Sequence, residues 1–167
     1  MTSEMALELE ALDAMFVQSA AAVEYIDGRI TLRGVTPSTL YFSDRPQRVV
    51  GHIGTREFVE IWGEGENSFA DDPPNAVLAF APRGGITPQD VVVEIRDPAL
   101  IGPDLSYAAT LLDGSLPARA EGCTLFIDPF GRPLSPVSVA GMARRSRRRA
   151  RRRLLLQPRE SNQIGRN

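Results

Sequence analysis

The chain has 167 residues, of which 43% are hydrophobic and 24% are charged, and its formal net charge is −2. This length is typical of a single domain with its own core, and no run approaches the roughly 18 apolar residues that a membrane-spanning helix needs. We therefore expect one compact domain without a transmembrane segment. The single cysteine, Cys123, excludes an internal disulfide and a zinc site built from paired cysteines, and its apolar neighbours predict a place in the core.

The first twenty residues predict a short amphipathic helix. Ser3 stands where a helix cap is expected. Four apolar residues follow at spacings of four, three and four, which places them on one helical face: Met5, Leu9, Leu12 and Phe16. The opening "MTSEMALELEAL" is acidic where a secretory signal would be basic, so we expect the protein to be cytoplasmic.

Short strands separated by glycine and proline follow this helix. Asp27-Gly28, between "VEYI" and "RITL", predicts a hairpin, because glycine accepts the positive φ of tight hairpin turns. We expect strands at about 22–26 and 29–34, and five more in "STLYF", "AVLAFA", "DVVVEIR", "LSYAATLL" and "CTLFID". In the third of these five, Val91, Val93 and Ile95 share one face, which is typical of a half-buried antiparallel strand.

Turn signals at Asp97-Pro98, Gly102-Pro103 and Asp113-Gly114 separate the last predicted strands. The strands do not alternate with helices, so a parallel α/β sheet is not expected. The fold predicted for residues 21–142 is mainly β, an antiparallel β-sandwich that is either Ig-like or a partly open barrel. It carries the short N-terminal helix and one inserted helix.

The inserted helix lies in a stretch of more than thirty residues, at 44–75, between two predicted strands. Thr55 is placed to cap it, and two glycines after Trp62 end it. Phe58, Ile61 and Trp62 share one face of this helix. We interpret the only tryptophan as a core residue that closes one end of the sandwich, and the alternative is that it stacks on a ligand.

The stretch "YFSDRPQRVVGH" holds the densest group of chemically versatile residues, Asp44, Arg45, Arg48 and His52. One interpretation is a small enzyme or anionic-ligand site, in which the arginines bind a carboxylate or phosphate and Asp44 orients His52 as a general base. The other interpretation is a turn, in which "SDRP" caps itself and Arg45 pairs locally with Asp44. The spacing matches no arrangement of nucleophile and base, so the turn is favoured.

The acidic loop "EGENSFADDPPNA" offers the oxygen ligands that calcium prefers, but it lacks the alternating ligands and the closing glutamate of an EF-hand. The sequence also lacks a phosphate-binding loop, a G-x-S-x-G elbow and an H-E-x-x-H pair. We therefore expect no metal and no cofactor, and we favour a binding module over an enzyme.

The runs "TLYFSDRPQRVVGH", "FADDPPNAVLAF" and "LFIDPFGRPLSPVSVAGMARR" resemble those of a family of small uncharacterised proteins, mostly bacterial, that share a "YFSDRP" and a "DPPNA" block. The resemblance covers about 16–145. It implies no particular activity and assigns no catalytic residues. Many of these relatives are exported, and this sequence departs from them in its acidic start, so the resemblance leaves the compartment open.

Charge is divided sharply along the chain. Residues 1–142 contain 9 arginines and 20 acids, a net charge of −11, and residues 143–167 contain 10 arginines and one acid, a net charge of +9. Such a density of positive charge cannot pack in a core, so we expect a disordered or conditionally helical tail that binds a polyanion. The predicted contacts are eight arginines: Arg144, Arg145, Arg147, Arg148, Arg149, Arg151, Arg152 and Arg153.

Two polyanions suit this tail: nucleic acid, where arginine–phosphate contacts release counterions, and an anionic lipid surface. The acidic body of the chain is a third partner, either within one molecule or in a homo-oligomer. No aromatic residues lie among the arginines to stack on bases, so base specificity is not expected. The functional hypothesis is a non-enzymatic binding or scaffolding domain that its tail tethers to a polyanion.

Overall fold

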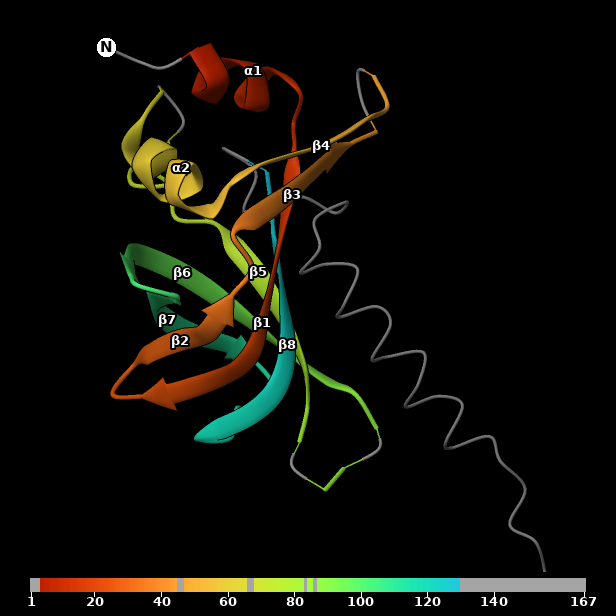
Figure 1. The fold of residues 1–167 in the computed structure, drawn as a ribbon, viewed down its shortest axis with the longest axis vertical. Coiled ribbons are helices and arrows are strands. Elements are labelled where there is room, and N and C mark those ends of the chain that lie inside the picture. The colour runs from red at the N-terminus through yellow and green to blue at the C-terminus, as the bar shows by residue number, and fades with distance from the viewer. Residues whose placement is uncertain (1–3, 45–46, 66–67, 83, 86, 130–167) are drawn as a thin grey trace, which may run out of the picture.

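The computed structural model describes residues 4–44, 47–65, 68–82, 84–85 and 87–129. Within these residues the chain forms eight strands, two α-helices and one 3₁₀ helix, and the helices gather at one end of the strands (Figure 1). The elements in chain order are α1 (Glu4–Ala11), β1 (Met15–Ile26), β2 (Arg29–Val35), β3 (Ser38–Ser43), β4 (Val49–Gly54), α2 (Thr55–Glu60), η1 (Ile61–Gly63), β5 (Asn75–Ala81), β6 (Gln89–Ile101), β7 (Asp104–Asp113) and β8 (Arg119–Ile127).

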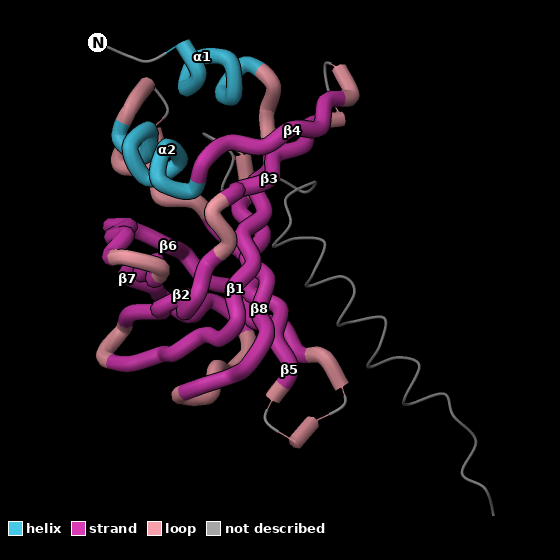
Figure 2. Tube along the Cα trace, viewed as in Figure 1, coloured by secondary structure: helices cyan, strands magenta, loops and turns pink. Residues whose placement is uncertain are grey.

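One antiparallel sheet contains all of the described strands and closes into a barrel. The barrel order is β2-β7-β6-β5-β8-β1, and pairing of β1 with β2 joins the two edges. The remaining hairpin, β3–β4, extends from the first part of β1 (Figure 2). The predicted mainly β, antiparallel architecture is confirmed, and of the two predicted forms, an Ig-like sandwich and a partly open barrel, the sheet takes the barrel form.

The length of β1 and two glycines explain this closure. The 12 residues of β1 pair with β8 along one edge, while the other edge pairs with β3 at 15–17 and with β2 at 20–26. Opposite Ala21, just after the change of partner from β3 to β2, Gly34 of β2 and Gly122 of β8 have φ of 63° and 66°. Glycine adopts this backbone without steric cost, so both neighbouring strands can bend there.

The N-terminal helix is shorter than predicted. α1 ends at Ala11 and β1 begins at Met15, so the assignment of residues 1–20 to a helix is wrong from residue 12 onward. Phe16 belongs to the strand, and its side chain is fully buried in the barrel core. Pairing along both edges of β1 outweighs the helical preference of the alanine-rich "SAAAVE".

Most of the other predicted strands are present. The Asp27-Gly28 hairpin is confirmed, and its two turn residues have φ of 51° and 75°. The predicted turn at Asp97-Pro98 is wrong: β6 continues through it as a bulge, because Asp97 adopts a φ of 50° and the register with β7 shifts there. β4 lies within the expected insertion, and its sequence "VVGHIG" hides the strand because glycine is unfavourable in strands.

The segment between β3 and β5 closes one end of the barrel. Phe58 of α2 lies 5.1 Å from Phe16 between ring centroids, and Trp62 of η1 lies 5.6 Å from Tyr107 of β7. Phe69 packs against Trp62 at 4.8 Å. Trp62 is only 6% exposed, so it is a core residue, as the closing role predicts. The insertion is therefore part of the main hydrophobic core.

Candidate functional site

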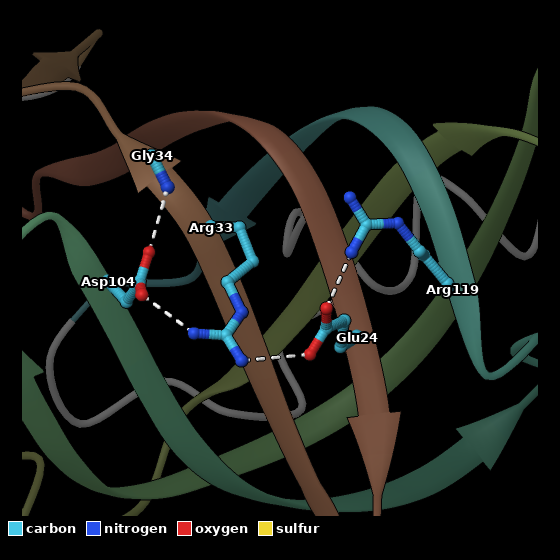
Figure 3. Close-up of polar contacts among 5 residues, drawn as sticks. All are labelled: Glu24, Arg33, Gly34, Asp104 and Arg119. Atoms are coloured by element: carbon cyan, nitrogen blue, oxygen red, sulfur yellow. Dashed lines mark hydrogen bonds and ion pairs between the residues drawn. The ribbon is translucent and has the colours of Figure 1, made fainter.

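A network of ion pairs joins four strands of the barrel within the described residues (Figure 3). Arg33 of β2 donates to Glu24 of β1 at 3.0 Å and to Asp104 of β7 at 2.7 Å. Arg119 of β8 donates to the second carboxylate oxygen of Glu24 at 2.6 Å. The backbone N–H of Gly34 donates to Asp104 at 3.1 Å. The network therefore lies across the pairing that closes the barrel.

Hydrogen bonds set the ionisation of this network. The side-chain hydrogen bond from Arg33 lowers the pKa of Glu24 and the pKa of Asp104, so both carboxylates are ionised at neutral pH. The side chains that form these pairs are between 20% and 54% exposed, so water screens their attraction. Each arginine is already engaged by a carboxylate, and the arrangement therefore suits a clamp on the barrel wall better than a site for an anion.

None of the predicted site residues belongs to this network, but part of it had a signal in the sequence. The Asp27-Gly28 hairpin fixes a register in which Glu24 and Arg33 lie diagonally on one face. Asp104 is 71 positions from Arg33, and Arg119 is 95 positions from Glu24. Those two contacts depend on the long-range pairing of β2 with β7 and of β1 with β8, which no local pattern predicts.

The residues of the predicted ligand or catalytic cluster are spread along the β3–β4 hairpin. Asp44 follows β3, and its carboxylate accepts a hydrogen bond from Nε of Arg48 at 3.4 Å. Both side chains are strongly exposed, at 76% and 86%. Arg45 lies outside the described residues. The local pairing that a turn predicts is present, with Arg48 as the partner of Asp44.

His52 does not share this position. It faces Leu40 in the hairpin, whereas the end of the hairpin beside Asp44 is the pair of Ser43 and Val49. Three residues along a strand correspond to about 10 Å. The structure therefore does not bring His52 close to Asp44. The hypothesis that the Asp44 carboxylate orients the His52 ring as a general base is not supported by this geometry.

A chain of hydrogen bonds crosses the barrel interior. The hydroxyl of Tyr107 donates to Gln18 at 2.7 Å, and Gln18 donates to Thr39 at 3.2 Å. The hydroxyls of Thr39 and Thr55 are 3.0 Å apart, and Thr55 donates to the carbonyl of Thr36 at 2.7 Å. Burial raises the pKa of the Tyr107 hydroxyl, which stays protonated as the first donor of the chain. Each of these buried polar groups finds a hydrogen-bond partner in its neighbour, so the series of hydrogen bonds connects the start of α2 to the strands of the barrel.

The same contacts correct the prediction that Thr55 caps the inserted helix. The N-cap of α2 is Gly54, with no side-chain cap, and Thr55 is the first helical residue. Its hydroxyl is directed to β3 and the turn before it, through Thr39 and Thr36. The hydroxyl of Thr55 therefore serves tertiary contacts, and α2 begins without a side-chain cap.

Cys123 is a core residue of β8, as predicted, and its side chain is 5% exposed. Burial raises the pKa of its thiol to about 11. The thiol is therefore protonated at neutral pH, and a protonated buried thiol is a poor nucleophile.

The acidic loop before β5 forms a local turn at its described residues. Ser68 donates to the carboxylate of Asp71 at 3.2 Å, and the N–H of Asp71 donates back to the Ser68 hydroxyl at 3.3 Å. Over the described ranges, no three His, Cys, Asp or Glu side chains gather as a metal would require. The helices of that same part of the chain are too short or too polar to span a membrane.

The outer face of the β3–β4 hairpin is a second candidate site, one suited to contact with another polypeptide. Leu40 and Phe42 of β3 are 50% and 37% exposed, and Val50 of β4 is 80% exposed. Phe42 and Val50 are direct cross-strand partners, and Leu40 faces His52. These side chains share one face without a charged residue among them, which is typical of a contact surface for another polypeptide segment.

The eight arginines predicted to bind a polyanion lie outside the described residues, as does the stretch predicted to be disordered. No protein-family model, curated protein or solved structure matches the chain. The resemblance to the family with the "YFSDRP" and "DPPNA" blocks therefore stays a prediction.

Proposed function

We propose that the protein is a non-enzymatic binding or scaffolding module, an acidic β-barrel that its arginine-rich segment tethers to a polyanion. The observation that carries this proposal is the separation of charge, −11 over residues 1–142 and +9 over residues 143–167. A phosphate-bearing surface attracts the second region and repels the first. Contact would therefore be confined to the arginine-rich segment, and the barrel would remain available for a second partner.

The placement of the acidic residues supports this division. The described residues 4–13, 55–65 and 68–72 contain nine acids and one arginine, and they form α1, α2, η1 and the adjoining turns. These helices lie together at one end of the barrel (Figure 1). Such an end is unsuited to phosphate, so the barrel itself offers little competing attraction for a polyanion.

The second hypothesis, a small enzyme or anionic-ligand site, has weaker support. It requires Asp44, Arg45, Arg48 and His52 to converge. Asp44 and Arg48 form an exposed local pair, and His52 lies about three strand positions away along the hairpin. The binding hypothesis needs no such convergence.

The test compares the full chain with a variant in which the eight arginines of 144–153 are replaced by glutamine. Fluorescence anisotropy with labelled single-stranded RNA, duplex DNA and vesicles containing anionic lipid is recorded across a salt series. We expect binding by the full chain with a slope of log K against log salt of about −6 for single strands if all eight arginines engage. We expect the variant to lose this binding. The control is Arg48→Gln with Arg56→Gln, which removes exposed arginines from the barrel and should leave the slope unchanged.

The outcomes separate the partners. Binding to nucleic acid alone, or to vesicles alone, identifies the polyanion. If the full chain binds none of the probes near physiological salt, the tether hypothesis is wrong. Salt-dependent self-association of the full chain, absent from the glutamine variant, would then identify the acidic body as the partner.

A further inference from the structure

A row of apolar side chains crosses the outside of the barrel. Five residues are direct cross-strand partners in succession from β6 to β3, and we call them the outer row: Val92, Val77, Phe126, Val17 and Leu40. Directly paired residues project from the same face of a sheet, and the opposite face here is the barrel core. Val77 and Val92, with Phe126 packed on them, accordingly form a hydrophobic cluster separate from that core.

Burial is uneven along the outer row. Val92 and Val77 are 0% and 4% exposed although they project from the outer face, whereas Leu40 is 50% exposed. Phe42, the next outward residue of β3, is 37% exposed. The outer row is thus buried at its β6 end and exposed at its β3 end. Exposed apolar side chains of this kind are suited to contact with another polypeptide segment that covers them.

The chain itself supplies a segment at the right place. β8 ends at Ile127, one residue beyond Phe126 of the outer row. The sequence from 130 to 142 is "FGRPLSPVSVAGM", which has one arginine, no acid and several large apolar residues. It differs sharply from the arginine-rich sequence after it. A largely apolar segment with a single charge matches the outer row, whose five residues carry no charge.

The length of this segment is sufficient. Five adjacent strands, about 4.8 Å apart, span about 19 Å, and 13 extended residues reach about 43 Å. From β8 to the exposed end of the outer row on β3 the distance is two strand spacings, about 10 Å. The segment can therefore cross the row from its start beside Phe126.

We propose that residues 130–142 dock on the outer row and fix the start of the arginine-rich segment to the side of the barrel. This inference is independent of any polyanion, since it concerns a contact within one chain. It assigns the exposed apolar face of β3 to an intramolecular partner. It also gives the arginine-rich segment a defined origin on the outside of the barrel.

The test uses the full chain with Leu40→Cys, modified with a benzophenone maleimide that crosslinks nearby residues on irradiation. The native Cys123 is buried, so the reagent is directed to position 40. The matched reporter is Ile101→Cys, which is 78% exposed at the turn between β6 and β7. Mass spectrometry of a mixture of isotope-labelled and unlabelled protein distinguishes crosslinks within one chain from crosslinks between copies.

We expect position 40 to crosslink to 130–142 of the same chain several-fold more than position 101 does. Leu134→Asp with Val137→Asp should reduce this yield several-fold, while Ser135→Asp with Ser138→Asp, which adds the same charge to the same segment, should preserve it. Equal yields from both reporters would overturn the proposal, as would equal losses with both segment variants. Crosslinks to a second copy would assign the surface to a dimer and equally overturn it.

Discussion

The barrel and the β3–β4 hairpin bring charged residues together in opposite ways. On the barrel, Glu24 and Arg119 are 95 positions apart in the chain, and their side chains meet at 2.6 Å. On the hairpin, Asp44 and His52 are close in sequence, yet about 10 Å of strand separates their positions. Strand register and closure of the sheet decide which side chains meet, and closeness in sequence does so only within a turn.

The largest expected contrast between the two regions concerns two phenylalanines on adjacent strands. Phe16 is fully buried, and its ring contacts Phe58 and Phe69. Phe16→Ala should lower the free energy of unfolding by about 3–5 kcal/mol, because it removes a core ring and leaves a cavity. Phe42→Ala, on the outer face of the hairpin, should cost about 1 kcal/mol or less. Urea unfolding measures both, and similar losses would contradict the assignment of Phe42 to the outside.

The next effect concerns the hydrogen-bond chain inside the barrel. Tyr107→Phe removes the donor to Gln18 while keeping the ring that packs on Trp62. The free energy of unfolding should fall by about 1–3 kcal/mol, because a buried acceptor loses its partner. Tyr25→Phe, at a half-buried position of β1, is the control and should cost less. If Tyr107→Phe and the natural protein unfold at the same temperature, the buried hydrogen bonds that begin at Tyr107 contribute nothing to stability.

A smaller, pH-dependent effect should follow from Glu24→Gln. The pKa of Glu24 is lowered in the folded state, so its contribution to stability is present above the ordinary pKa of 4.5 and is lost as the pH falls through the lowered value. The unfolding midpoints of the natural chain and the variant should therefore differ most at neutral pH and converge in acid. High salt should also reduce the difference, because the pairs are partly exposed. A difference that persists unchanged at low pH would contradict this origin.

The smallest effect is expected on the hairpin. Asp44→Asn removes one partner of an exposed pair at 3.4 Å, and His52→Ala removes an exposed side chain. Surface pairs of this type contribute little, so both unfolding midpoints should stay close to that of the natural chain in thermal scans. A loss with Asp44→Asn as large as that with Glu24→Gln would erase the distinction between the two regions.

Local patterns in the sequence predicted much of the barrel. The shared buried face of Val91, Val93 and Ile95 and the Asp27-Gly28 turn each depend on a few consecutive residues, and both are confirmed, although Val92 on the opposite face is buried as well. Trp62 was predictable as a core residue because its helical face is apolar. The pairing of Asp44 is similarly local, but the sequence named Arg45 as its partner, and the structure gives Arg48, four positions away.

What the sequence could not predict depends on distant partners. Phe16 fits a helical spacing as well as a strand, and only the neighbours β3 and β8 decide between them. Sandwich and barrel share the same alternation, and the choice rests on β1 pairing with both β2 and β8. The ion-pair network needs that closure first, so Asp104 and Arg119 gave no signal of their own.

The position of β1 between β2 and β8 has a consequence for the timing of folding during synthesis. β1 ends at residue 26 and its partner β8 ends at residue 127, so about a hundred residues must be made before this edge is paired. At about 5–20 residues per second, the ribosome needs about 5–20 s for that interval. During this time the β1–β2 hairpin presents an unpaired apolar edge to the cell. The nascent chain is thus most exposed to aggregation, and most in need of chaperones, before β8 emerges.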